Sequence, residues 1–155
     1  MVNIVVDDKI PFIHGVLEEY ANVRYLPPKE ITRQQLVDVD ALVIRTRTRC
    51  NAELLDGTRV KFIASATIGY DHIDTAYCAA NSIKWTNAAG CNASSVEQYI
   101  LAALLELSSR RSFRLSEKTI GVVGVGNVGS KVAAMAAILG MKVLLCDPPR
   151  ARRER

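Results

Sequence analysis

A glycine-rich turn in the second half of the sequence carries the clearest chemical signal. Gly124, Gly126 and Gly129 have the spacing G-x-G-x-x-G, directly after the apolar run 119–123 and at the start of a helix-period segment. In a βαβ unit the first glycine permits a tight turn, the second lets a pyrophosphate approach the backbone, and the third lets the helix pack against the strand. Free N–H groups at the start of the helix attract phosphate. The spacing therefore predicts a dinucleotide-binding loop, with an ordinary glycine turn as the alternative.

An acidic residue closes the next apolar run. Asp147 follows residues 141–146, at the end of the strand after the expected helix. A carboxylate at this point accepts hydrogen bonds from the adenosine ribose hydroxyls and repels a 2′-phosphate, which predicts NAD as the cofactor. The alternative is NADP, because the tail contains Arg150, Arg152, Arg153 and Arg155. The tail follows two prolines, however, so its guanidinium groups can point elsewhere, and we expect a solvated loop.

Strand-like and helix-like segments alternate throughout the chain, which predicts an α/β fold with a mostly parallel sheet and helices on both faces. We expect a flavodoxin-like substrate domain over residues 1–91, followed over residues 92–155 by a linking helix and the first βαβ unit of a Rossmann NAD-binding domain. The expected strands are 2–6, 23–25, 41–45, 62–66, 83–86, 120–123 and 141–146, and the expected helices are 12–20, 31–39, 52–56, 73–80, 92–109 and 126–139.

The expected helix 92–109 is apolar on nearly every face. A helix of this kind is usually buried on several sides. We therefore expect it at a domain junction or a subunit interface.

Two expected strand ends of the first domain carry possible ligand chemistry. Arg45 and Thr46 follow one strand, and Thr67 and Gly69 follow another. Ligands of open α/β sheets bind beyond the carboxyl ends of the strands, and arginines beside hydroxyl groups pair well with anions. The alternative for residues 45–49 is a solvated loop without a specific partner. We assign neither His14 nor His72 as an acid or base, since His14 is expected on a surface helix and His72 in a loop.

Composition excludes several classes of protein. Of the net charge of +4, residues 150–155 supply +3, because they contain four arginines and one glutamate. The rest of the chain is nearly neutral, so we expect no nucleic-acid partner. No apolar run approaches the ~20 residues of a membrane span, and the N-terminus does not have the pattern of a signal peptide. We expect a cytoplasmic protein. The four cysteines show no metal or disulfide spacing, so we expect no metal site and reduced, mostly buried thiols.

Together these features resemble the D-2-hydroxyacid dehydrogenase family: a small α/β domain, an apolar linking helix, the glycine motif and the acid at the next strand end. The resemblance implies that Thr46 and Thr67 contact substrate, and that Asn127 and Val128 contact NAD beside the glycines and Asp147. It also implies a homodimer. The family's catalytic arginine, glutamate and histidine would lie beyond residue 155, so we expect no catalytic residue in this chain and no turnover by it alone.

Five stretches narrow the resemblance to family members that act on a phosphorylated four-carbon hydroxy acid; they are residues 5–11, 66–72, 89–93, 121–129 and 144–150. The implied reaction is hydride transfer from C2 of a small phosphorylated hydroxy acid to the nicotinamide. Two alternatives stay open. One is a related dehydrogenase of 3-phosphoglycerate or glyoxylate, and the other is a non-enzymatic NAD-sensing module.

Overall fold

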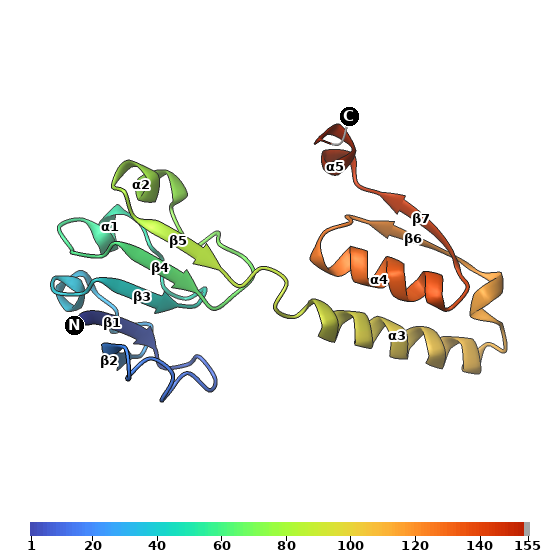
Figure 1. Ribbon diagram of the computed structural model, residues 1–155, viewed down its shortest axis with the longest axis horizontal. Coiled ribbons are helices and arrows are strands. Elements are labelled where there is room, and N and C mark those ends of the chain that lie inside the picture. The colour runs from blue at the N-terminus through green and yellow to red at the C-terminus, as the bar shows by residue number, and fades with distance from the viewer. Residues whose placement is uncertain (154–155) are drawn as a thin grey trace. The chain divides into compact units, whose positions relative to one another are not determined.

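The computed structural model describes residues 1–153 and separates into two compact units, Met1–Ala89 and Gly90–Arg155 (Figure 1). The sequence had suggested a boundary after residue 91. Each unit is described by itself below.

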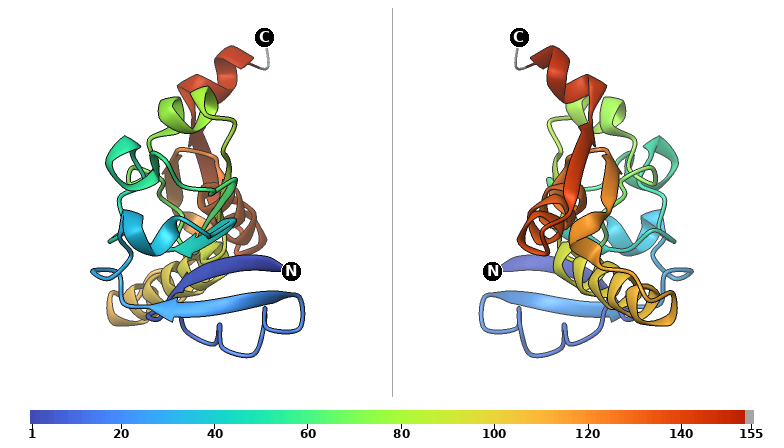
Figure 2. Two further views of the ribbon diagram at one scale, coloured as in Figure 1. Left: turned by 90° about the vertical axis from the view of Figure 1, so that its left-hand side faces the viewer. Right: turned by 90° about the vertical axis from the view of Figure 1, so that its right-hand side faces the viewer.

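The first unit is built on a parallel five-stranded sheet. Its strand order is β2-β1-β3-β4-β5, which is the flavodoxin-like order expected from the sequence. All four neighbouring pairs are parallel, and Figures 1 and 2 show β1 and β2 side by side. The strands are β1 (Val2–Asp7), β2 (Ala21–Leu26), β3 (Ala41–Ile44), β4 (Phe62–Ser65) and β5 (Lys84–Asn87).

The core of this unit comes from the inward-facing residues of the central strands. Val5, Leu42, Ile44 and Ile63 are fully buried in one cluster. Complete burial of such a side chain contributes about 1.5–3 kcal/mol, so these strands form the rigid part of the unit. Their carboxyl ends hold the loops that the sequence had marked for ligand binding.

Three short helical segments cover the sheet, namely η1 (Arg33–Leu36), α1 (Ala52–Leu55) and α2 (Thr75–Ala80). The side chain of Asn51 accepts from the N–H of Leu54 at the start of α1, and Asp74 does the same for α2. Such caps satisfy N–H groups that a helix cannot pair by itself.

The expected helix over residues 12–20 is wrong. This segment forms turns, with positive φ at Phe12 (59°) and Gly15 (82°). The carboxylate of Glu18 accepts from the N–H groups of Gly15 and Leu17. Such local side-chain bonds give the backbone an alternative to helical pairing.

The expected helix over residues 31–39 shrinks to the single 3₁₀ turn η1. Arg24 donates to the carbonyl oxygen of Gln35 at 2.6 Å, which occupies an acceptor that a longer helix would use. Leu36 and Val39 are nevertheless fully buried. The segment therefore supplies core residues without the backbone conformation of a full helix.

The second unit contains one parallel strand pair and two long helices. Strands β6 and β7 pair along their whole length, and α4 packs against them and against α3 (Figure 1). The elements are α3 (Ala93–Arg110), η2 (Leu115–Glu117), β6 (Thr119–Val123), α4 (Asn127–Ile138), β7 (Lys142–Cys146) and α5 (Pro148–Arg153). This β6–α4–β7 arrangement is the βαβ unit that the sequence predicts.

Within the described chain, α3 is not buried on several sides, since only Ala93 among its residues is buried and Tyr99 is 74% exposed. Its expected place at a domain junction or a subunit interface is not tested by a single chain and stays a prediction. The loop expected after residue 147 is wrong, because residues 148–153 form the helix α5. Pro148 stands at its start, where a proline costs no hydrogen bond and has a suitable φ.

Candidate functional site

The glycine-rich turn between β6 and α4 has the geometry of a phosphate-binding loop. Gly124 has a φ of +85°, a conformation that side-chain-bearing residues rarely adopt. A Cβ placed on Gly126 would meet no atom within 4 Å, so the backbone there is open to a ligand. Asn127 begins α4, and the first N–H groups of an α-helix have no acceptor within the helix. The turn can therefore offer N–H groups to a phosphate.

Gly129 shows why the third glycine of the motif cannot carry a side chain. A Cβ at this position would overlap the carbonyl oxygen of Gly124 and would lie 3.2 Å from a methyl carbon of Val122. The missing side chain allows the first turn of α4 to pack directly on the end of β6. This is the role that the sequence spacing assigns to the residue.

Asp147 lies against the same turn. Its carboxylate oxygen Oδ2 accepts the N–H of Val125 at 2.7 Å. The two ends of the predicted motif, the glycine turn and the acid after β7, are thus brought together. The N–H of Gly124 donates to the carbonyl oxygen of Cys146 at 2.8 Å, so two N–H groups of the turn are engaged. The groups that could bind a phosphate are therefore those at the start of α4.

The start of α4 also contacts the segment that precedes α3. Gly90 has a φ of +81°, and a Cβ built on it would come within 2.9 Å of the Asn127 side chain. Asn127 therefore packs against bare backbone, and Val128 follows it with partial exposure.

The first unit carries a basic cavity at the ends of β1 and β3. Its volume is about 380 Å³, and its lining includes Lys9, Arg45, Thr46 and Arg47. These two strands are neighbours from which the chain proceeds in opposite directions across the sheet. Such a switch point is the usual ligand site of open α/β sheets. Three cations and a hydroxyl at this place can hold an anionic group.

A buried carboxylate forms part of this cavity. Asp7, the last residue of β1, is 1% exposed, and its Oδ1 accepts the N–H of Lys9 at 2.8 Å. Its Oδ2 is buried and makes no hydrogen bond to any of the described residues. Arg45 donates to the carbonyl oxygen of Lys9 at 3.0 Å, which fixes its guanidinium at the rim.

A second cavity of about 440 Å³ shares two residues with the first. Thr46 and Arg47 line both, and here they are joined by Arg49, Gly69 and His72 together with Asp71. The structure thus brings the predicted residues Arg45, Thr46 and Gly69 to adjoining cavities.

Thr67 is held in place by a chain of hydrogen bonds. Its Oγ1 lies 2.8 Å from the Oγ of Ser65, which lies 2.9 Å from Nε2 of His72. Thr67 also donates to the carbonyl oxygen of Gly69 at 3.3 Å. Ser65 and His72 are 3% and 8% exposed, and burial lowers the pKa of His72 although nearby Asp71 acts in the opposite direction.

Sequence reasoning missed four of these residues: Asp7, Lys9, Ser65 and His72. Asp7 and Ser65 are the last residues of two strands, and this position is the signal that could have found them. No spacing in the sequence predicts the bond of His72 to Ser65, although the residue lies in a loop as expected.

The other histidine is on the surface, as expected, but on a turn. The ring of His14 stacks on Tyr25 with 3.9 Å between ring centroids. Among residues 1–153 we find no cluster of three or more histidine, cysteine or acidic side chains that could hold a metal ion. No helix in the described part of the chain is long and apolar enough to span a membrane.

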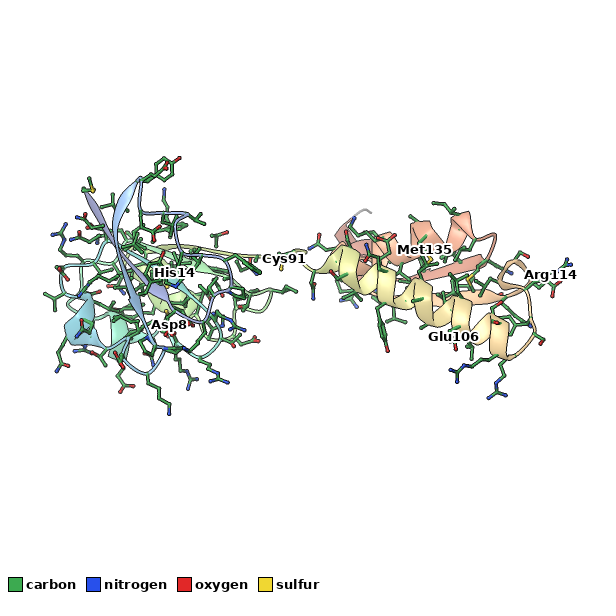
Figure 3. The ribbon with its side chains drawn as sticks, turned by 90° about the horizontal axis from the view of Figure 1, so that it is seen from below. Asp8, His14, Cys91, Glu106, Arg114 and Met135 are labelled. Carbon is green, nitrogen blue, oxygen red and sulfur yellow. The ribbon has the colours of Figure 1, made fainter. Side chains whose placement is uncertain are left out.

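The four cysteines are free thiols, but only half of them are buried. Cys50 and Cys78 lie in the core of the first unit, and burial raises the pKa of Cys50 to about 12. Cys91, in the segment that leads into α3 (Figure 3), and Cys146 are exposed. The expectation of mostly buried thiols is therefore correct for the first unit alone.

Comparison with known proteins decides the family. Residues 4–139 match the family model described as D-isomer specific 2-hydroxyacid dehydrogenase, catalytic domain. The chain belongs to this family. An erythronate-4-phosphate dehydrogenase of Bacteroides fragilis is 57% identical over 152 residues, which are 97% of this chain and 44% of that protein. The chain thus spans less than half the length of this D-2-hydroxyacid dehydrogenase.

Two solved structures of similar fold differ in their cofactor. The NAD⁺-bound 3-phosphoglycerate dehydrogenase of Entamoeba histolytica is 28% identical with a TM-score of 0.72, over 95% of this chain and 54% of that one. An acyclic imino acid reductase in complex with NADPH and D-Arg is 20% identical with a TM-score of 0.76, over 96% and 57%. The fold alone therefore does not select between NAD and NADPH.

Proposed function

We propose that this chain is the N-terminal part of an NAD-dependent dehydrogenase that oxidises 4-phospho-D-erythronate by hydride transfer from C2, a step in the biosynthesis of pyridoxal 5′-phosphate. The 57% identity to a relative of that name is the observation that carries the proposal. A related dehydrogenase of 3-phosphoglycerate or glyoxylate is the alternative, since a family member of that kind shares the fold.

The first unit would hold the substrate. The cavity lined by Lys9, Arg45 and Arg47 has the charge and the volume for a phosphate group. The adjoining cavity, which shares Thr46 and contains Gly69, would take the carboxylate end. Because both cavities meet at Thr46 and Arg47, one short acid could occupy both at once.

The second unit would hold NAD. The residues at the glycine turn fit a dinucleotide, because the backbone at Gly126 is open and no side chain caps the start of α4. The first N–H groups of a helix have no acceptor within it and attract phosphate. Asp147 would accept the ribose hydroxyls while it keeps the turn in place through Val125. With NAD bound, the nicotinamide ring would serve as the hydride acceptor.

The chain's own histidines do not suit the proton transfer from the substrate hydroxyl. His72 has Nε2 engaged with Ser65, and His14 is stacked on Tyr25. We therefore propose that the acid and base groups lie beyond residue 155, and that the 155-residue chain alone has no turnover.

We further propose that the whole protein is a cytoplasmic homodimer. Support for an interface comes from the apolar side chains that α3 leaves exposed in this chain, among them Tyr99, Leu105 and Leu107.

A fusion protein tests the assignment. Residues 1–155 joined to the remaining C-terminal part of the B. fragilis relative should form NADH from 4-phospho-D-erythronate, whereas the 155-residue chain should form none. Activity with 3-phosphoglycerate or glyoxylate alone would favour the alternative dehydrogenases. Cofactor binding without oxidation of any of these acids would favour an NAD sensor.

Calorimetric titration of the 155-residue chain tests the cofactor site. Asp147→Asn should weaken NAD binding by about 10- to 100-fold, because a charged hydrogen bond contributes about 1.5–3 kcal/mol. Asp38→Asn, a surface change far from the glycine turn in the sequence, is the matched control. Equal affinity of the native chain for NADP and NAD would contradict the proposed role of Asp147.

A further inference from the structure

The hydrogen bonds between His72, Ser65 and Thr67 have a direction that their chemistry fixes. Three contacts form one line, from Nε2 of His72 to Ser65 at 2.9 Å, from Ser65 to Thr67 at 2.8 Å, and from Thr67 to the carbonyl oxygen of Gly69 at 3.3 Å. A carbonyl oxygen can only accept, so Thr67 must donate its single hydroxyl proton to Gly69.

The other two contacts follow from this one. Because the Thr67 proton is used, Ser65 must donate to Thr67. Ser65 has one hydroxyl proton as well, so Nε2 of His72 must donate to Ser65. One direction alone satisfies all three contacts, and it requires a proton on Nε2. Burial lowers the pKa of His72, which favours the neutral ring. A neutral imidazole carries one ring proton, so with that proton on Nε2 the other nitrogen, Nδ1, has none.

This direction makes Thr67 a strengthened donor. A hydroxyl that accepts a hydrogen bond becomes more polarised and donates more strongly. The bond from Thr67 to Gly69, at 3.3 Å, is beyond the usual range for O–H donors. A closer anionic oxygen would therefore compete well for the Thr67 proton.

We propose that His72 is a positioning residue which, acting through Ser65, keeps the Thr67 hydroxyl a donor toward a carboxylate of the bound acid. The inference rests on the proposed function, in which Thr67 contacts substrate. A carboxylate is favoured because Gly69, the present acceptor of the Thr67 proton, lines the cavity that also contains His72 and Arg49. The more basic cavity around Lys9 and Arg45 remains for the phosphate.

The tautomer of His72 is the first test, and it needs no ligand. The chain has two histidines, so ¹⁵N-labelled protein gives two sets of imidazole signals, and His14→Gln identifies each. A two-bond ¹H–¹⁵N correlation spectrum near pH 7.5 should show His72 protonated on Nε2 and bare on Nδ1. A spectrum with the proton on Nδ1 would overturn the inference.

Variants of the 155-residue chain provide the second test. His72→Leu removes the donor, while His72→Gln retains an N–H that can reach Ser65. The Leu variant should bind D-erythronate about tenfold more weakly, and the Gln variant should recover most of that loss. Inorganic phosphate should bind both variants equally, because it would occupy the other cavity. Ser65→Ala breaks the same chain with His72 intact and should match the Leu variant, so it replaces that variant if His72→Leu does not fold.

The outcomes separate this inference from the proposed function. If 4-phospho-D-erythronate binds but neither His72→Leu nor Ser65→Ala weakens it, the inference is wrong and the proposed substrate stands. If 3-phosphoglycerate binds with the full dependence on His72 and 4-phospho-D-erythronate does not bind, the proposed substrate is wrong and the inference stands. If His72→Leu weakens phosphate as much as erythronate, the assignment of Thr67 to a carboxylate is wrong.

Discussion

The two units of this chain use the same α/β construction but differ in how well they cover their apolar surface. Residues 1–89 form an open five-stranded sheet that packs with its helices into one large core, in which Val5, Leu42 and Ile63 are fully buried. Residues 90–153 hold a strand pair with smaller clusters, and Val123 and Ile138 in this part are 85% and 88% exposed. Within the described chain, only the first unit buries its large apolar side chains in one extended core.

This difference bears on the two proposed binding sites. The cavities of the first unit stand at the ends of buried strands, so their side chains are held by a rigid support. The glycine turn of the second unit is held by more local contacts, namely the packing of Gly129 and the bond from Val125 to Asp147. We therefore expect a substitution in the second unit to disturb the glycine turn more than a substitution in the first unit disturbs its cavities.

Thiol labelling tests the comparison with the largest expected effect. Cys50 and Cys78 lie buried in the first unit, and burial raises the pKa of both thiols. Cys91 and Cys146 lie exposed in the second unit. Under native conditions the buried pair should react with iodoacetamide at least about a thousandfold more slowly than the exposed pair, because labelling requires the first unit to open. Peptide mass spectrometry over time gives the rate at each cysteine.

Labelling in denaturant is the control, since all four thiols should then react at similar rates. Equal rates at Cys50 and Cys91 without denaturant would contradict the difference in burial between the units.

A change at the glycine turn should produce the next largest effect. In Gly129→Ala the new methyl would overlap the Gly124 carbonyl oxygen, so α4 must move away from β6. We expect the second unit to lose about 3 kcal/mol of stability, while the first unit keeps its own. Hydrogen exchange followed by mass spectrometry reads the two units separately.

Gly126→Ala is the matched variant. Its methyl meets no atom within 4 Å and its φ is −84°, so the stability should change by less than about 1 kcal/mol. NAD binding by Gly126→Ala should nevertheless fall, because the new methyl group would occupy the space in which a pyrophosphate approaches the backbone. Comparable destabilisation by both substitutions would show that Gly129 has no special packing role.

The sequence predicted the fold well where one pattern dominates. Parallel sheets bury their strands on both sides, so continuous apolar runs such as residues 41–44 are easy to recognise. The glycine spacing likewise specified the turn that joins β6 to α4. Each of these features is encoded within a few neighbouring residues.

Predictions failed where distant or side-chain contacts decide the backbone. The turns over residues 12–20 depend on hydrogen bonds that the Glu18 carboxylate accepts, and the shortened helix near Gln35 depends on a bond that Arg24 donates from β2. The bond between His72 and Ser65 likewise joins a loop to a strand end. No periodicity in the sequence reports such contacts, and for this reason the contact of His72 with Ser65 was missed. Asp7 and Ser65 could have been found from their positions at the ends of strands.

Mild acid should weaken the first unit selectively, with the smallest of these effects. Burial lowers the pKa of His72 in the folded state, so between that pKa and the ordinary value near 6.5 the unfolded chain binds more protons than the folded one. The stability therefore falls as the pH drops below about 6.5, by at most about 1.4 kcal/mol per pH unit. The second unit contains no histidine, since the two in the chain are His14 and His72.

Urea unfolding at pH 7.5 and pH 5.5 provides the measurement, and His72→Gln should remove most of the difference. The carboxylate of Asp40, whose pKa is lowered chiefly by the N–H of Asn3, acts in a separate window. Its contribution is lost only as the pH falls below about 3.8, so it does not interfere. An unchanged pH dependence in His72→Gln would mean that the imidazole of His72 is solvated in the folded state. The loops around His72 would then be more open to water than the structure shows.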